Sequence, residues 1–172
     1  MGIALKNMTD NQSCATSIGI DKVSIPHYLD KPQIVTQISD NEIVQDEFNR
    51  WVEPVEDCIT RTLHHAIGQN SNLRKIVTLQ SNNSNNLDYK IHVLIHDFIP
   101  NDIDKTITLF STWYMTDRQD NHIVSKESRI TTTYISDDNS DDDEKKEEKQ
   151  NNNKYVHIVS GMEQAVIQLG TE

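Results

Sequence analysis

The sequence predicts an α+β protein, α/β in the broad sense, in which a mixed, largely antiparallel sheet is covered by two amphipathic helices. Three observations support this fold class. Several runs rich in β-branched residues alternate apolar and polar positions, two other segments repeat apolar residues every three or four positions, and turn signals join neighbouring runs. The order is strands, helix, several strands and helix, without an internal repeat. We therefore expect a single domain over residues 1–172.

Four candidate strands precede the first helix. They occupy residues 3–6, 18–25, 33–39 and 42–48. The alternation in the second run breaks near Asp21, which suggests a β-bulge, and Pro26 ends this run. Asp40-Asn41 is a typical hairpin turn, so the last two runs are expected to pair with each other.

Residues 51–69 change from strand to helix periodicity. The apolar positions at three- and four-residue spacing are Val52, Val55, Ile59, Leu63 and Ile67. Pro54 suits the first turn of a helix, and Gly68 suits its end. An amphipathic helix that lies on the sheet is expected here.

The remaining strands are expected at residues 73–79, 87–99, 106–115 and 122–135. Pro100 should end the second of these, because proline lacks the amide that a sheet ladder needs. The last two runs are rich in β-branched and aromatic residues and are joined across Asp117 to Asn121. They predict a long antiparallel hairpin.

Residues 136–153 are charged and asparagine-rich, so we predict a disordered acidic insertion ahead of the second amphipathic helix at 155–169. Part of this insertion matches the ligand spacing of a calcium loop. The matching residues are Asp137, Asn139, Asp141 and Glu148. Asp142 occupies the position that requires glycine, so a chance register in an acid-rich stretch is the favoured interpretation.

Composition narrows the range of partners. The formal net charge is −11, from 27 acidic and 16 basic residues, so phosphate backbones would repel the chain and a nucleic-acid partner is not expected. No apolar run is long enough to span a membrane, and no signal peptide is visible. Cys14 and Cys58 lack metal-site spacing. Two buried free thiols are the favoured interpretation, and a disulfide between them is the alternative.

No constellation of residues predicts catalysis. His92 and His96 are four residues apart, and on a strand that spacing is about 13 Å, too far for two ligands of one zinc ion. A nucleophile elbow and a glycine-rich phosphate loop are both absent from the sequence. We expect no enzymatic activity, no metal ion and no cofactor.

Two proline-containing stretches are candidates for contact with another subunit. One is a stiff, partly apolar loop between two strands, and the other is the entrance to the first helix. The structural alternative is a rigid crossover whose aromatic side chains pack on their own sheet and helix. The candidate interface residues are Tyr28, Leu29, Pro32, Trp51, Glu53 and Pro54.

Three motifs in and after these stretches carry a family resemblance. They are Ile25-Pro26-x-Tyr28-Leu29-Asp30-x-Pro32-Gln33-Ile34-Val35, then Glu47-Phe48-x-Arg50-Trp51-x-Glu53-Pro54, then the strand end Asp97-Phe98. In this order they resemble the PqiC family of ABC-type transport auxiliary lipoproteins, and the resemblance covers about residues 3–169. The long acidic insertion departs from the family pattern.

The resemblance implies a non-enzymatic lipoprotein that faces the periplasm, tethered to the outer membrane by an N-terminal lipid anchor missing from this chain. Its implied partners are MCE-type or ABC transporter subunits that move lipids and support envelope integrity, and it implies a homo-oligomer. Two alternatives stay open: a periplasmic lipoprotein adaptor that activates a cell-wall synthase, and a lipid-binding carrier with its own apolar pocket.

Overall fold

The computed structural model describes residues 16–69, 73–79, 87–135 and 147–172. The strand expected at 3–6, Cys14 and the calcium-like residues 137, 139 and 141 therefore lie outside the described residues. The disulfide and calcium alternatives rest on these residues.

Within the described residues, eight strands form one mixed sheet. The strands are β1 (Thr16–Ile20), β2 (Gln33–Ser39), β3 (Glu42–Arg50), β4 (Leu73–Thr78), β5 (Tyr89–Asp97), β6 (Pro100–Asn101), β7 (Thr106–Asp117) and β8 (His122–Thr133). Their order is β3-β2-β6-β7-β5-β1-β4, and β8 pairs with β7. The pairs β2–β3, β5–β7, β6–β7 and β7–β8 are antiparallel, whereas β1 runs parallel to β4 and β5, and β2 runs parallel to β6. The predicted fold class is confirmed.

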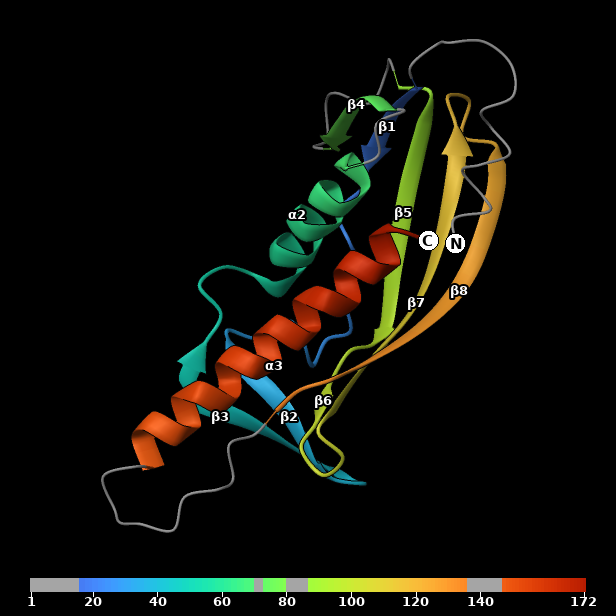
Figure 1. The fold of residues 1–172 in the computed structure, drawn as a ribbon. Helices are drawn as coiled ribbons and strands as arrows, with labels where there is room; N and C mark the ends of the chain where they lie inside the picture. Colours follow the sequence, from blue (N-terminus) through green and yellow to red (C-terminus); the bar gives the residue numbers. More distant parts are fainter. Residues whose placement is uncertain (1–15, 70–72, 80–86, 136–146) are drawn as a thin grey trace.

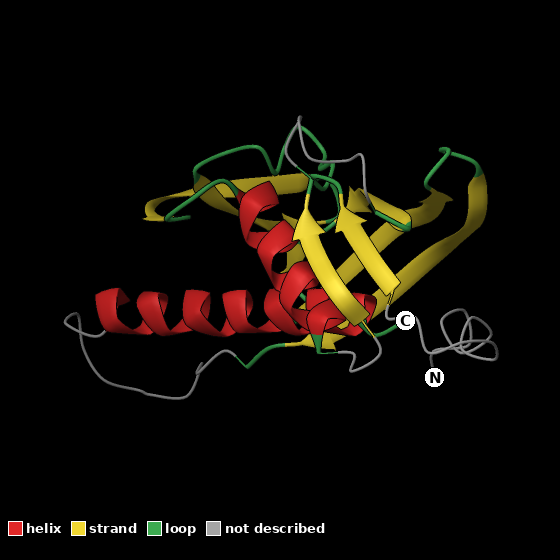
Figure 2. Cartoon of the chain, turned by 90° about the horizontal axis from the view of Figure 1, so that it is seen from above, coloured by secondary structure: helices red, strands yellow, loops and turns green. Residues whose placement is uncertain are grey.

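Both helices, α2 (Val55–Gly68) and α3 (Glu147–Gly170), cover the same face of the sheet. The long strands β7 and β8 bend around them (Figure 1), and the view from above places both helices on one side of the long strands (Figure 2). Along β7, alternate side chains from Ile107 to Met115 point into the core, as the period of a half-buried strand requires. The main hydrophobic core lies between this face and the two helices.

The first helix begins later than its apolar periodicity predicts. Helix α2 starts at Val55, and Pro54 is its N-cap residue. The residue before a proline disfavours the helical conformation, so Glu53 keeps the chain extended until the proline is passed. Val52 consequently lies outside the buried stripe and is fully exposed, at 104% of its reference area.

Two strand boundaries also differ from the prediction. Strand β1 ends at Ile20, and the chain then follows β5 through backbone hydrogen bonds from Asp21 N to Ile91 O (2.9 Å) and from Ser24 N to Val93 O (3.0 Å). Pro100 does not end sheet pairing: it opens the short strand β6, which lies between β2 and β7. Proline is tolerated there because it is the first residue of its strand.

The second helix starts inside the stretch that was expected to be disordered. Helix α3 begins at Glu147, ahead of the predicted start at 155. Glutamate, lysine and glutamine are good helix formers, so a helix anchored by the apolar residues after 154 can extend backwards through them.

The two helices approach closely near the C-terminus of α3. A Cβ atom added at Gly170 would stand 2.7 Å from the Cβ atom of Ala66, whereas one added at Gly68 would meet Ile76 at 3.5 Å. We expect Gly170→Ala to lower the free energy of unfolding by about 1 kcal/mol because the helices must separate. Gly68→Ala is the matched control, and we expect it to be neutral or slightly stabilising. Urea denaturation of both variants tests this, and equal effects would contradict the close approach.

Candidate docking groove

The three motifs that carry the family resemblance come together in space. The Tyr28 hydroxyl donates a hydrogen bond to Asp97 Oδ1 (2.7 Å) and accepts one from Phe98 N (3.1 Å). The backbone N–H of Trp51 donates a hydrogen bond to the backbone carbonyl oxygen of Pro32 (2.8 Å). The loop between β1 and β2 therefore connects the end of β5 to the entrance of α2.

Leu29 and Tyr28 hold this loop in place rather than presenting an apolar surface. Leu29 is 4% exposed and belongs to the core, which corrects the expectation that its side chain is available for contact. Tyr28 is half-buried and packs against the same core. Burial raises the pKa of Tyr28 far above its ordinary value, and the hydrogen bond to the Asp97 carboxylate raises it further. Pro32, by contrast, is exposed.

At the entrance to α2, Glu53 organises a small polar cluster. Its carboxylate accepts a hydrogen bond from Cys58 Sγ (3.2 Å) and forms an ion pair with Arg61. The thiol hydrogen bond and then Arg61 hold the pKa of Glu53 below its ordinary value. Burial, followed by the bond to Glu53, raises the pKa of the Cys58 thiol, and a thiol kept protonated is a poor nucleophile. Pro54 is exposed beside this cluster.

A groove of about 190 Å³ opens between α2 and α3. Its residues are Trp51, Val55, Cys58, Ile59, Arg61, Thr62, Phe98, Val159, Met162, Glu163 and Val166. The floor is apolar and buried, whereas Arg61 and Glu163 are exposed at the rim. Trp51 and Phe98 come from two of the three motifs, and Tyr28 binds the backbone of Phe98. The motifs therefore build one wall of a groove.

Two apolar side chains in and around the second motif face solvent. Val52 directly follows Trp51 and is fully exposed, and Phe48 on the edge strand β3 is 90% exposed. Phe48 belongs to a resembling motif, but sequence reasoning did not select it as a site residue. It also missed Val52, Arg61 and Glu163. The sequence held one signal for Val52. The residue before a proline disfavours the helical conformation, so an apolar residue that precedes a Glu-Pro pair lies outside the apolar stripe of the helix that follows.

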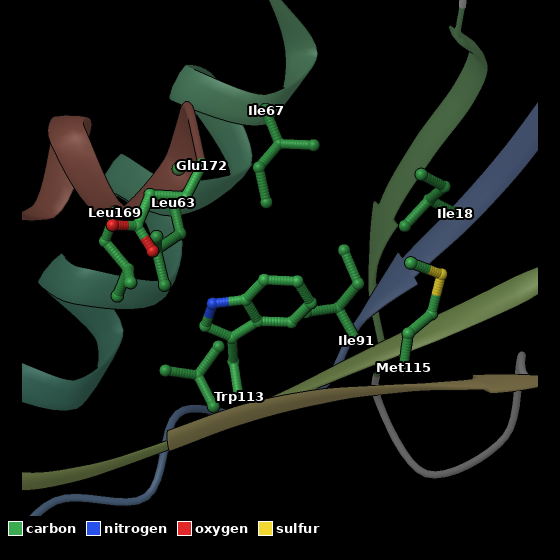
Figure 3. Close-up of a pocket in the computed structure, with 10 residues that line it drawn as sticks. Ile18, Leu63, Ile67, Ile91, Trp113, Met115, Leu169 and Glu172 are labelled. Carbon is green, nitrogen blue, oxygen red and sulfur yellow. The ribbon is translucent and has the colours of Figure 1, made fainter. Parts of the chain in front are cut away.

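A second, smaller cavity of about 50 Å³ lies between the helices and the sheet (Figure 3). It is lined mainly by apolar side chains, with the Trp113 indole and Glu172 at one side. The Trp113 nitrogen lies close enough to Glu172 to help lower the pKa of that carboxyl, yet has no partner in hydrogen-bond geometry among the described residues. Burial pushes the pKa of Glu172 upward, and hydrogen bonds from Ser128 and Lys126 outweigh this effect.

The histidines of β5 have separate partners. His92 Nδ1 lies 3.0 Å from Asp21 Oδ2, and His96 Nε2 lies 2.7 Å from Thr112 Oγ1. Over the part of the chain that the structure describes, no group of three or more His, Cys, Asp or Glu side chains is arranged to hold a metal ion. Among those same residues, no helix combines the length and the apolar character needed to cross a bilayer.

The sequence model of the family described as "ABC-type transport auxiliary lipoprotein component" matches residues 4–172. The chain belongs to this family, which confirms the resemblance seen in the motifs. Its members are auxiliary lipoprotein components of ABC-type transport.

Solved structures share the fold. A protein from Xanthomonas campestris is 13% identical, with a TM-score of 0.69 over 95% of this chain and 83% of that one. A second, uncharacterized protein is 18% identical, with a TM-score of 0.67 over 93% and 92% of the two chains. A weaker likeness, with a TM-score of 0.48 and 8% identity over 90% and 85%, is to the PelC dodecamer from Paraburkholderia phytofirmans. No curated protein matches the chain at a significant level.

Proposed function

We propose that this chain is the periplasmic domain of a non-enzymatic lipoprotein that docks onto an MCE-type or ABC transporter and supports lipid transport and envelope integrity. The family match over residues 4–172 carries this proposal. The convergence of the family motifs on a surface groove supports it, because docking needs an exposed, preformed contact site. An N-terminal lipid tether to the outer membrane would raise the local concentration of the domain near its partner.

The proposal includes self-association into a homo-oligomer. Phe48 and Val52 are the most exposed large apolar side chains among the described residues, and burial of their surface against a second copy would stabilise an oligomer. Light scattering over a concentration series should give a defined multiple of the 19.8 kDa chain. A monomer at every concentration, also in the presence of the lipid-anchored form, would contradict self-association.

Co-purification tests the transport role. The lipidated protein, tagged at its C-terminus and extracted from the membranes of its own host, should bring down an MCE-type protein and ABC transporter subunits in comparable amounts. A peptidoglycan polymerase in their place would favour the cell-wall adaptor. If the partner is the transporter, loss of the gene for this protein should make cells more sensitive to detergents.

The structure gives less support to a lipid carrier. The apolar cavity in Figure 3 holds about 50 Å³, well below the roughly 150 Å³ of an engineered cavity that binds benzene. A phospholipid acyl chain would require the helices to separate from the sheet. Native mass spectrometry that detects bound phospholipid in the purified domain would restore the carrier alternative.

A further inference from the structure

We propose that the groove between α2 and α3 binds a protein segment that presents one large apolar side chain next to a lysine or arginine. This inference rests on the proposed function and deepens it by naming the chemistry of the docking partner. Three features of the groove lead to it: its size, the charge at its rim, and the apolar surface beside it.

The size of the groove suits one large side chain. Its volume of about 190 Å³ is slightly larger than the roughly 150 Å³ cavity that admits a benzene molecule. Its floor is formed by buried apolar side chains, among them Ile59, Phe98 and Met162. Protein interfaces commonly place a single aromatic or aliphatic anchor in a water-excluding pocket of this kind.

The charge at the rim of the groove favours a basic residue in the partner. Arg61 is already paired with Glu53. Glu163, on the opposite helix, is exposed and has no hydrogen bond or ion pair with any residue that the structure describes. A basic residue in the partner would complement this carboxylate, and an acidic one would be repelled by it and by the net charge of −11.

The surface next to the groove extends the apolar contact. Trp51 lines the groove, and Val52 directly follows it with its side chain fully exposed. A pocket that continues into exposed apolar side chains is typical of the centre of a protein interface. An anionic bilayer would be repelled by the acidic chain, which favours a protein partner over a membrane surface.

Two capped dipeptides, acetyl-Lys-Phe-amide and acetyl-Glu-Phe-amide, test the inference directly. Each is titrated into the ¹⁵N-labelled chain, and amide shifts are followed by NMR. We expect the Lys-Phe peptide to shift the amides of Cys58, Thr62, Val159 and Glu163. We expect its affinity to exceed that of the Glu-Phe peptide by about 3- to 5-fold, the size of an exposed charge effect.

Matched variants separate the apolar and the electrostatic contributions. Val159→Phe fills the groove and should weaken binding by about 10-fold or more, whereas Val156→Phe, on the exposed side of the same helix, should leave it unchanged. Glu163→Lys should reverse the preference between the two peptides. Asp104→Lys makes the same charge change at an exposed site on the β6–β7 turn and should not reverse it.

Several outcomes would overturn the inference. These are equal affinities for the two peptides, a preference that survives Glu163→Lys, or no shifts at about 20 mM peptide. If phosphatidylcholine vesicles broaden the groove amides while neither peptide shifts them, the surface is a membrane contact and the inference is wrong. If the peptides fail while transporter subunits still co-purify with the chain, the proposed function stands and this inference alone falls.

Discussion

Phe98→Ala is expected to lower the free energy of unfolding by about 3–5 kcal/mol, as deletion of a buried aromatic ring usually does. Phe98 is 1% exposed and sits where the chain passes from β5 to β6. Its ring lines the floor of the groove, and its backbone N–H is held by the Tyr28 hydroxyl. The substitution therefore removes core packing and also widens the groove.

Urea denaturation followed by far-UV circular dichroism measures this loss. Phe48→Ala is the matched control, because the same ring is removed from a side chain that is 90% exposed. We expect the control to change the free energy of unfolding by no more than about 0.5 kcal/mol. Similar losses for the two variants would mean that Phe98 does not anchor the core at this point.

The fold class was predictable because local periodicity reports which face of an element is buried. The hairpins β2–β3 and β7–β8 follow from turn residues between alternating strands, and both formed where the sequence indicated. Parallel pairing of β1 with β4 was not predictable in this way. Its partners are more than fifty residues apart in sequence, and no turn signal connects them.

Parts of the candidate site were predictable, but the groove was not. The motif residues Pro32, Trp51 and Glu53 were selected from the sequence, and the structure places all three at or near the groove. The opposite wall comes from α3, where Glu163 belongs to no motif. Its position depends on how the two helices cross, and the close approach of Gly170 to Ala66 is one of the contacts between them.

Leu29 shows why exposure is harder to infer than secondary structure. Its proline-rich surroundings predicted an exposed loop, yet the Tyr28 hydrogen bonds draw the loop onto the end of β5 and bury Leu29 in the core. Simultaneous replacement of Tyr28 and Leu29 by alanine would therefore damage the fold. Docking is better tested at Val159 and Glu163, because their substitutions fill the groove and change the charge of its rim, respectively.

The position of α3, and so of the outer wall of the groove, depends on a charged cluster at Asp102. The Asp102 carboxylate accepts hydrogen bonds from Lys154 Nζ in α3 (2.6 Å), from Lys105 Nζ in the β6–β7 turn (2.8 Å) and from the Tyr134 hydroxyl after β8 (3.0 Å). The side chain of Asp102 is 20% exposed. One carboxylate thus ties together the helix, the turn and the end of the last strand.

Asp102→Asn is expected to lower the free energy of unfolding at pH 7 by about 2 kcal/mol, within the range for hydrogen bonds to a charged group. Partial burial raises the pKa of Asp102, but hydrogen bonds from Lys105 and Lys154 outweigh it and hold the pKa below its ordinary value. A carboxyl whose pKa is lowered by folding stabilises the protein fully above its unfolded pKa of about 3.9, and the effect disappears as the pH falls through the folded pKa. The difference between the wild type and Asp102→Asn should therefore be large at pH 7 and shrink below about pH 4.

Urea denaturation at pH 7 and below about pH 4 measures the difference in the free energy of unfolding between the wild type and Asp102→Asn. Asp104→Asn is the control. Asp104 is two residues away, is exposed and has no side-chain hydrogen bond or ion pair among the described residues, so its replacement should change the free energy of unfolding little at either pH. A loss in Asp102→Asn that persists undiminished in acid would show that the carboxylate acts through packing rather than through its charge. A loss confined to neutral pH would establish that an ion-pair cluster at Asp102 fixes α3, and with it the rim that carries Glu163.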